Sequence, residues 1–96
     1  MKTKEEIIQT IKALHDELGK YKVREIGVFG SVVRGEQKRE SDIDVLVDFA
    51  DDADLFDLVG LGLFLEEKLG GKVDVVPKRA LRKELRDSVL KEVVPA

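Results

Sequence analysis

The chain has 96 residues, 43% of them hydrophobic and 39% charged, so it is too apolar to be disordered and has the length of one domain, residues 1–96. Its net charge of −3 and its 5% of aromatic residues argue against direct nucleic-acid binding, which usually needs a basic surface with stacking aromatics. The chain has no cysteine and no apolar run of signal-peptide or membrane-spanning length, which excludes disulfides and predicts a cytoplasmic protein without membrane association.

The N-terminal segment predicts an amphipathic helix that ends at Gly19. Thr3 and Glu6 have the spacing of a capping box, in which each side chain satisfies a free backbone N–H group at the start of a helix. His15, the only histidine of the chain, flanks the apolar stripe of this helix and is expected to be a partly packed surface residue rather than a ligand. The stripe has helical spacing and consists of Ile7, Ile8, Ile11, Leu14 and Leu18.

The rest of the chain alternates between predicted strands and helices. The strands are expected at 23–29, 42–49 and 73–76, and the helices at 31–34 (a short helix or turn), 55–69 and 80–93. Leu81, Leu85 and Val89 are expected to face inward from the last helix. This order predicts an α/β (α+β) domain in which helices pack on a small mixed sheet of about three to four strands.

The predicted helix 55–69 is unusual because nine large apolar residues surround its axis almost completely. A domain of this size buries one face of a helix well but rarely both. Two interpretations are open: a core helix with some exposed apolar surface, or an interface with a second copy or a partner protein. On the second interpretation we expect a homodimer or hetero-oligomer, with Leu61 and Phe64 on the outward side.

Charged residues dominate the start of the last predicted helix. Its basic run, from Lys78 to Arg86, is interrupted by Glu84, which is typical of a solvated helix face. The chain also lacks asparagine and is rich in Lys, Arg, Asp and Glu. Few thermolabile residues and many surface ions favour a thermophilic source.

The most informative segment joins a Gly-Ser turn to two acids in an otherwise apolar strand. Ten residues separate Ser31 from Asp42, and Asp44 follows two positions later. Residues i and i+2 of a strand point to the same face, so the two carboxylates can converge on one or two divalent ions. Gly30 and Ser31 offer backbone N–H groups at the end of a predicted strand, a suitable place for phosphate oxygens. This combination indicates metal-dependent chemistry on a nucleotide.

A third acid, Asp74, stands alone in the apolar run of the last predicted strand. It is either an edge-strand residue that faces solvent or a third carboxylate on the face of Asp42 and Asp44. Three carboxylates can hold two Mg²⁺ ions roughly 3.5–4 Å apart, the arrangement used in nucleotidyl transfer. Ligands that are all oxygen favour Mg²⁺ or Mn²⁺ over Zn²⁺.

Taken together, Gly30-Ser31, Asp42-Ile43-Asp44 and the later Asp74 resemble the signature of the DNA polymerase β-like nucleotidyltransferase superfamily. The string GSVVRGEQKRESDIDVLVDF resembles the minimal nucleotidyltransferases (MNT), the antitoxins of prokaryotic HEPN/MNT toxin–antitoxin modules. The resemblance extends over nearly the whole chain. One departure is Val33, where family members often carry alanine, and it leaves the chemistry untouched.

The resemblance implies a polymerase β-like nucleotidyltransferase core that binds ATP with two Mg²⁺ ions. It implies that Gly30 and Ser31 hold the triphosphate and that Asp42 and Asp44 bind both metal ions. It further implies that Asp74 binds the catalytic metal and helps activate the acceptor hydroxyl. For Arg34, the family string leaves two roles open, a phosphate contact or a structural ion pair that braces the loop.

The resemblance also implies a partner, a HEPN-domain ribonuclease toxin encoded beside the chain. In this hypothesis the protein is an enzyme that transfers AMP to a tyrosine of the toxin and so silences it. A second hypothesis is an antitoxin that neutralises the toxin by contact and keeps a vestigial or regulatory nucleotide site. A third, a nucleotidyltransferase for small molecules, suffers from the lack of an acceptor-binding domain, so we expect the acceptor to dock from outside.

Overall fold

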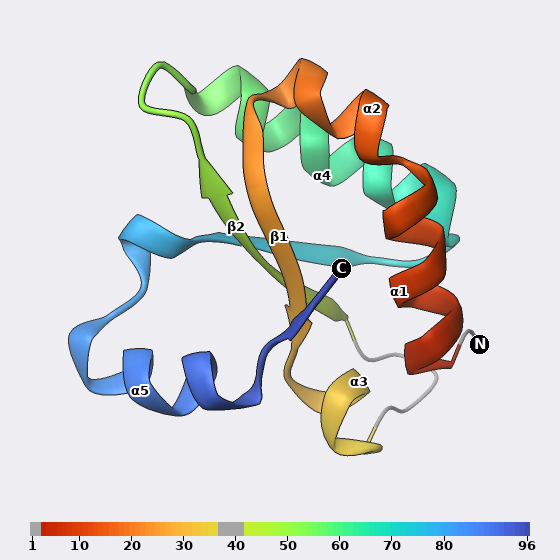
Figure 1. Ribbon diagram of the computed structural model, residues 1–96, viewed down its shortest axis with the longest axis vertical. Coiled ribbons are helices and arrows are strands. Elements are labelled where there is room, and N and C mark those ends of the chain that lie inside the picture. Colours follow the sequence, from red (N-terminus) through yellow and green to blue (C-terminus); the bar gives the residue numbers. More distant parts are fainter. Residues whose placement is uncertain (1–2, 37–41) are drawn as a thin grey trace.

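The computed structural model describes residues 3–36 and 42–96 and has a mixed α/β architecture, which confirms the predicted fold class (Figure 1). In chain order its elements are α1 (Lys4–Ala13), α2 (His15–Leu18), a 3-10 turn (Gly19–Tyr21), β1 (Val23–Phe29), α3 (Ser31–Arg34), β2 (Ile43–Phe49), α4 (Leu55–Leu69), β3 (Val73–Pro77), a second 3-10 turn (Lys78–Ala80), α5 (Lys83–Glu92) and β4 (Val94–Pro95).

The four strands form one mixed sheet in the order β3-β2-β1-β4. The central strands β1 and β2 are antiparallel, β4 is antiparallel to β1, and β3 is parallel to β2. Helix α4 connects the parallel strands β2 and β3. The sheet therefore places the β2 and β3 acids at the same end of two neighbouring strands.

Side chains of β2 alternate between the two faces of the sheet. Ile43, Val45 and Val47 are buried and belong to the main apolar cluster, together with residues of α1, α2 and α4. Residues between them, such as Asp44 and Leu46, belong to the opposite face, and Leu46 is buried outside that cluster. We call these the covered face and the open face of the sheet. Helix α5 lies on the side away from α1 and α4 (Figure 1).

The predicted N-terminal stripe packs in the core, with Leu14 only partly buried, but its helix is not continuous. Thr3 caps this helix: its hydroxyl accepts the Glu6 N–H group at 3.2 Å and donates to the Glu6 carboxylate at 3.3 Å. The helix is interrupted at Leu14, and a short second helix and a 3-10 turn carry the chain to Tyr21. His15 is exposed, in agreement with the predicted surface position.

Helix α4 has a definite inner side, and its predicted outward residues were wrong. Leu61 is completely buried and Phe64 packs against the core, with its ring centroid 5.4 Å from that of Tyr21. Because apolar residues surround the helix, the sequence does not indicate which side is buried. Packing against the sheet determines it. The outward residues, which we call the α4 stripe, are 53–86% exposed: Leu55, Phe56, Val59 and Leu63.

The C-terminal prediction was also partly wrong. Helix α5 begins at Lys83 rather than at residue 80, and it has no buried residue. Leu85, predicted to face inward, is 48% exposed. Val94 and Pro95 then form β4, which pairs with β1. This two-residue strand is too short for a sequence pattern to predict. Pro95 fits there because an edge strand does not need every backbone donor.

Candidate active site

The sheet brings two of the three predicted acids side by side. Asp44 is the second residue of β2 and Asp74 the second residue of β3, and they are direct partners in the parallel register. Asp42 lies immediately before β2 and is exposed. Asp74 is exposed and Asp44 half-buried, so the cluster opens to solvent at the edge of the open face. Of the two interpretations of Asp74, the geometry favours a carboxylate next to Asp44.

Asp44 is the electrostatic centre of this cluster. Partial burial raises the pKa of its carboxyl, and repulsion from Asp74 and then Asp42 raises it further, while Arg34 lowers it. None of the ion pairs among residues 3–36 and 42–96 involves one of these three acids. A cation bound there would relieve the repulsion between the carboxylates.

The donor set fits a hard divalent cation, because it consists of carboxylate oxygens that already repel one another. Within the described part of the chain, no three His, Cys, Asp or Glu side chains are arranged as a ready ligand cluster. Asp42, Asp44 and Asp74 would therefore have to draw together around an ion. The exposed positions of Asp42 and Asp74 leave room for that adjustment.

The Gly-Ser turn lies directly against Asp44. Gly30 has φ 81° and ψ −151°, a conformation that only glycine adopts readily. A Cβ atom at Gly30 would overlap the Oδ2 atom of Asp44, so this close approach also requires glycine. Ser31 opens α3, and the Gly30 carbonyl accepts the N–H groups of Val33 and Arg34. The predicted phosphate-binding turn thus lies directly beside Asp44.

Arg34 makes the ion pairs that were one of its two open roles. Its Nε donates to Glu36 at 3.3 Å and its Nη1 to Glu92 at 2.6 Å. These bonds raise the pKa of the guanidinium, Glu92 contributing most. Glu92 also accepts the Gly30 N–H group on its other oxygen, at 3.1 Å. Sequence reasoning missed Glu92 because it lies far along the chain, in a helix that looks like a solvated surface.

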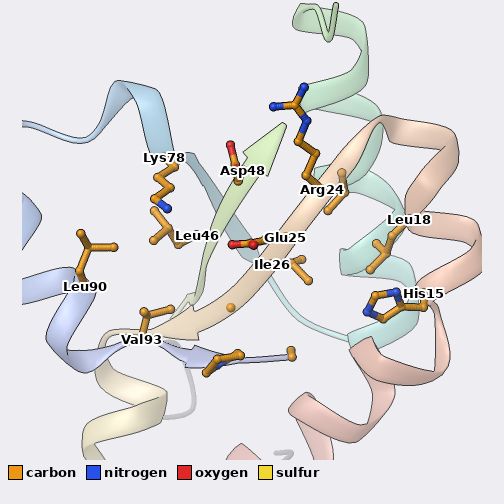
Figure 2. A pocket seen from close by; sticks show the side chains of 14 residues that line it. His15, Leu18, Arg24, Glu25, Ile26, Leu46, Asp48, Lys78, Leu90 and Val93 are labelled. Carbon is orange, nitrogen blue, oxygen red and sulfur yellow. The ribbon is translucent and has the colours of Figure 1, made fainter. Parts of the chain in front are cut away.

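A cavity of about 370 Å³ is lined by residues of β1 and β2 (Figure 2). Its other walls come from α2, the second 3-10 turn, α5 and the C-terminal segment. Glu25, Leu46 and Asp48 form part of its wall on the sheet, and Lys78 and Leu90 face them (Figure 2). None of the three acids lines it. It is thus not part of the acid cluster.

The described residues contain no helix that is both long and apolar enough to cross a bilayer.

The nucleotidyltransferase domain family model matches residues 6–95. The chain belongs to the nucleotidyltransferase domain family. A similar protein is the protein adenylyltransferase MntA of Thermococcus cleftensis, which is 47% identical over 95 residues, or 98% of this chain and 96% of the relative. The resemblance to minimal nucleotidyltransferases, drawn from the sequence motifs, is thereby confirmed.

Solved structures agree with this assignment. A protein described as a minimal nucleotidyltransferase matches with a TM-score of 0.78 and 38% identity, and the match covers 93% of this chain and 95% of the other. A toxin–antitoxin complex with AMP-PNP matches with a TM-score of 0.73 and 32% identity, over 93% of this chain and 70% of that chain. The fold is therefore that of these nucleotidyltransferase structures.

Proposed function

We propose that this nucleotidyltransferase transfers AMP from ATP to a hydroxyl group of a HEPN-domain toxin, a tyrosine in the first instance, and so acts as an antitoxin. The observation that carries the proposal is the register of Asp44 with Asp74 directly beside the Gly30 turn. Two similarities support it: the relative MntA is a protein adenylyltransferase, and a similar chain belongs to a toxin–antitoxin complex with AMP-PNP. We further propose that residues 1–96 act as a single catalytic domain.

In this proposal the turn binds the triphosphate and the acids bind the metal ions. Ser31 and Arg34 hold the triphosphate through a backbone N–H group, a hydroxyl and the guanidinium, and Gly30, whose own N–H group donates to Glu92, lets the turn approach the phosphates closely. Asp42 and Asp44 hold two Mg²⁺ ions, for which Mn²⁺ can substitute, and Asp74 shares the catalytic ion. When bound, the ions neutralise charge on the triphosphate and on the leaving group.

The transfer is a substitution at the α-phosphorus of ATP. The acceptor oxygen forms a new bond to that phosphorus, and the bond to the bridging oxygen of the β-phosphate breaks, so pyrophosphate leaves. The hydroxyl proton passes to the carboxylate of Asp74. Because Asp74 is exposed and Asp44 half-buried, an acceptor side chain can approach Asp74 from solvent.

The acceptor is proposed to dock from outside, because Asp42 and Asp74 are exposed to solvent. The α4 stripe supplies an apolar surface for protein contact, with Phe56 86% and Leu55 70% exposed. This stripe also supports the second hypothesis, in which contact alone neutralises the toxin. The two hypotheses differ in what happens to the toxin, since only the enzyme leaves an AMP group on it.

The test begins with calorimetry of ATP binding in the presence of Mg²⁺ or of a chelator. We expect Mg²⁺-dependent binding that is lost when Asp42→Asn and Asp44→Asn are combined, because two ion ligands disappear. Asp48→Asn, on the same strand and face, is the matched control and should bind normally. Metal-independent binding, or unchanged affinity in the double variant, would remove the metal site from the proposal.

The second part of the test incubates the protein with ATP, Mg²⁺ and the HEPN protein encoded beside it. We expect mass spectrometry to find AMP added to the HEPN protein, on a tyrosine. An unmodified toxin that is nevertheless inhibited would establish the contact mechanism instead.

A further inference from the structure

Glu92 joins both ends of the short helix that carries the proposed triphosphate donors. Its Oε2 accepts the N–H group of Gly30, just before α3, and its Oε1 accepts from Arg34, the last residue of α3. The two bonds use different oxygens, so they form together. The side chain is only 19% exposed although it is charged. Because both of its oxygens accept hydrogen bonds from the two ends of α3, this carboxylate holds the turn and the helix together.

The pairing of β4 with β1 explains why Glu92 arrives at this point. Val94 is the register partner of Val28, and two further steps along each chain lead to Glu92 and Gly30. The backbone after Glu92 is thus fixed to the strand that runs into the turn, and Figure 1 shows α5 ending beside α3. The Glu92 side chain continues the ladder where backbone pairing stops.

The anchored peptide lies where precision matters most. Gly30 has a backbone conformation that only glycine adopts readily, and its Cα lies against the Asp44 carboxylate. A shift of this turn would change the distance between the donors of Ser31 and the acids. Glu92 also brings a negative charge near Asp44, which adds to the causes that raise the pKa of Asp44. That unfavourable contact is tolerated because Gly30 and Arg34 hold the carboxylate.

We propose that Glu92 is a positioning residue of the nucleotide site, which holds the Gly30 turn and Arg34 in the geometry that receives the triphosphate. It acts through these two groups and does not itself touch the substrate. Arg34 keeps further donors for a phosphate, because a guanidinium has five N–H groups and Glu36 and Glu92 each engage one nitrogen. The proposal rests on the proposed function, since it names what orients that site.

The opposite interpretation is that Glu92 imitates a phosphate and blocks the site until ATP displaces it. The two interpretations predict opposite signs. If Glu92 positions the turn, its removal weakens ATP binding, because the Gly30 turn and Arg34 are no longer held in the geometry that receives the triphosphate. If Glu92 competes with ATP, its removal strengthens ATP binding.

The experiment compares Glu92→Ala and Glu92→Gln with Glu84→Ala, a glutamate in the exposed first turn of the same helix. Calorimetry measures the affinities of ATP and of AMP, both with Mg²⁺, under conditions where circular dichroism shows folded protein. We expect about tenfold or greater loss of ATP affinity in Glu92→Ala, the size typical for a lost charged hydrogen bond. Glu92→Gln, which keeps one acceptor oxygen, should lose less, and Glu84→Ala nothing.

AMP affinity separates positioning from general damage. AMP lacks the β- and γ-phosphates, so we expect its affinity to change much less than that of ATP in the Glu92 variants. Equal losses for ATP and AMP, or a gain in ATP affinity, would overturn the positioning role. If wild-type protein bound no ATP at all, the proposed function would fail first and this inference with it.

The anchoring contact can be checked without any nucleotide. In the free protein, NMR should show a large shift of the Gly30 amide proton and faster exchange of it with solvent in Glu92→Ala. Glu84→Ala should leave that signal in place. An unchanged Gly30 amide in Glu92→Ala would overturn the inference whatever the binding data show.

Discussion

The two faces of the sheet use the same strands for different purposes. On the covered face, Val45 and Val47 are completely buried against α1, α2 and α4. On the open face, Asp44 lies near Asp74 and Asp42. Partial burial and repulsion from these acids raise its pKa, so the ionised carboxylate opposes folding. Because successive strand residues point to opposite sides, one strand can stabilise the fold and carry charges that oppose it. Changes to one face should therefore leave the property of the other almost intact.

The largest effect is expected from Asp74→Asn, on the open face. If Asp74 accepts the acceptor proton, AMP transfer should fall roughly 10³-fold, while ATP affinity changes little, because proton transfer acts mainly in the transition state. Transfer is followed with labelled ATP and the proposed HEPN partner, and Asp87→Asn, an exposed acid on α5, serves as control. Full transfer by the Asp74 variant would mean that this acid is only a neighbour of Asp44.

The complementary change lies on the covered face, at Leu61. Leu61→Ala should lower the free energy of unfolding by about 2–5 kcal/mol, because it leaves a cavity in a fully buried position. Urea denaturation measures this, with Leu63→Ala at a 63% exposed position of the same helix as the control. The ATP affinity of the folded Leu61 variant should match wild type. A large loss of affinity would show that the two faces are coupled.

The covered face and the acid pair were predictable because both follow from strand periodicity. The alternation around Ile43, Val45 and Val47 fixed which side of β2 is buried, and therefore where Asp44 points. The partnership of Asp44 with Asp74 required only that the two strands be neighbours in a parallel register. The sequence left the direction and register of these strands open, and the sheet shows that they are parallel with Asp44 opposite Asp74.

What the sequence could not predict depends on packing between distant segments. Nine apolar residues surround α4, so the sequence does not show which side is buried. Leu61 was expected on the outward side but is completely buried. Glu92 looks like an ordinary helix residue until β4, too short to leave a pattern, brings it to Gly30. Both failures concern contacts whose partners lie far apart in the chain and share no local periodicity.

The α4 stripe belongs to neither face of the sheet. A charge placed in this stripe tests whether α4 binds a partner. We expect Leu63→Glu to weaken self-association, or binding to the HEPN protein, because it places a charge in an apolar contact. The melting temperature of the monomer should stay close to wild type, since Leu63 is exposed. Sedimentation velocity with and without the toxin measures both, and Lys12→Glu on α1 is the charge control. A wild-type monomer that also ignores the toxin would show that the stripe has no partner of either kind.

The smallest expected effect concerns the stability cost of Asp44 itself. Its pKa is raised in the folded protein, so protonated Asp44 favours the fold and ionised Asp44 opposes it. The stabilising contribution is complete below the ordinary aspartate pKa of about 3.9 and is lost as the pH rises through the folded-state pKa. At neutral pH without metal, Asp44→Asn should therefore melt at a higher temperature than wild type.

The pH dependence of that difference identifies its cause. The gain in melting temperature of Asp44→Asn over wild type should shrink as the pH falls, because wild-type Asp44 then becomes neutral as well. Mg²⁺ should raise the melting temperature of wild type and reduce the gap, since the ion relieves the repulsion from Asp74 and Asp42. Asp87→Asn on the exposed side of α5 is the control. A variant that melts below wild type at neutral pH would mean that ionised Asp44 stabilises the fold through a contact that outweighs its burial.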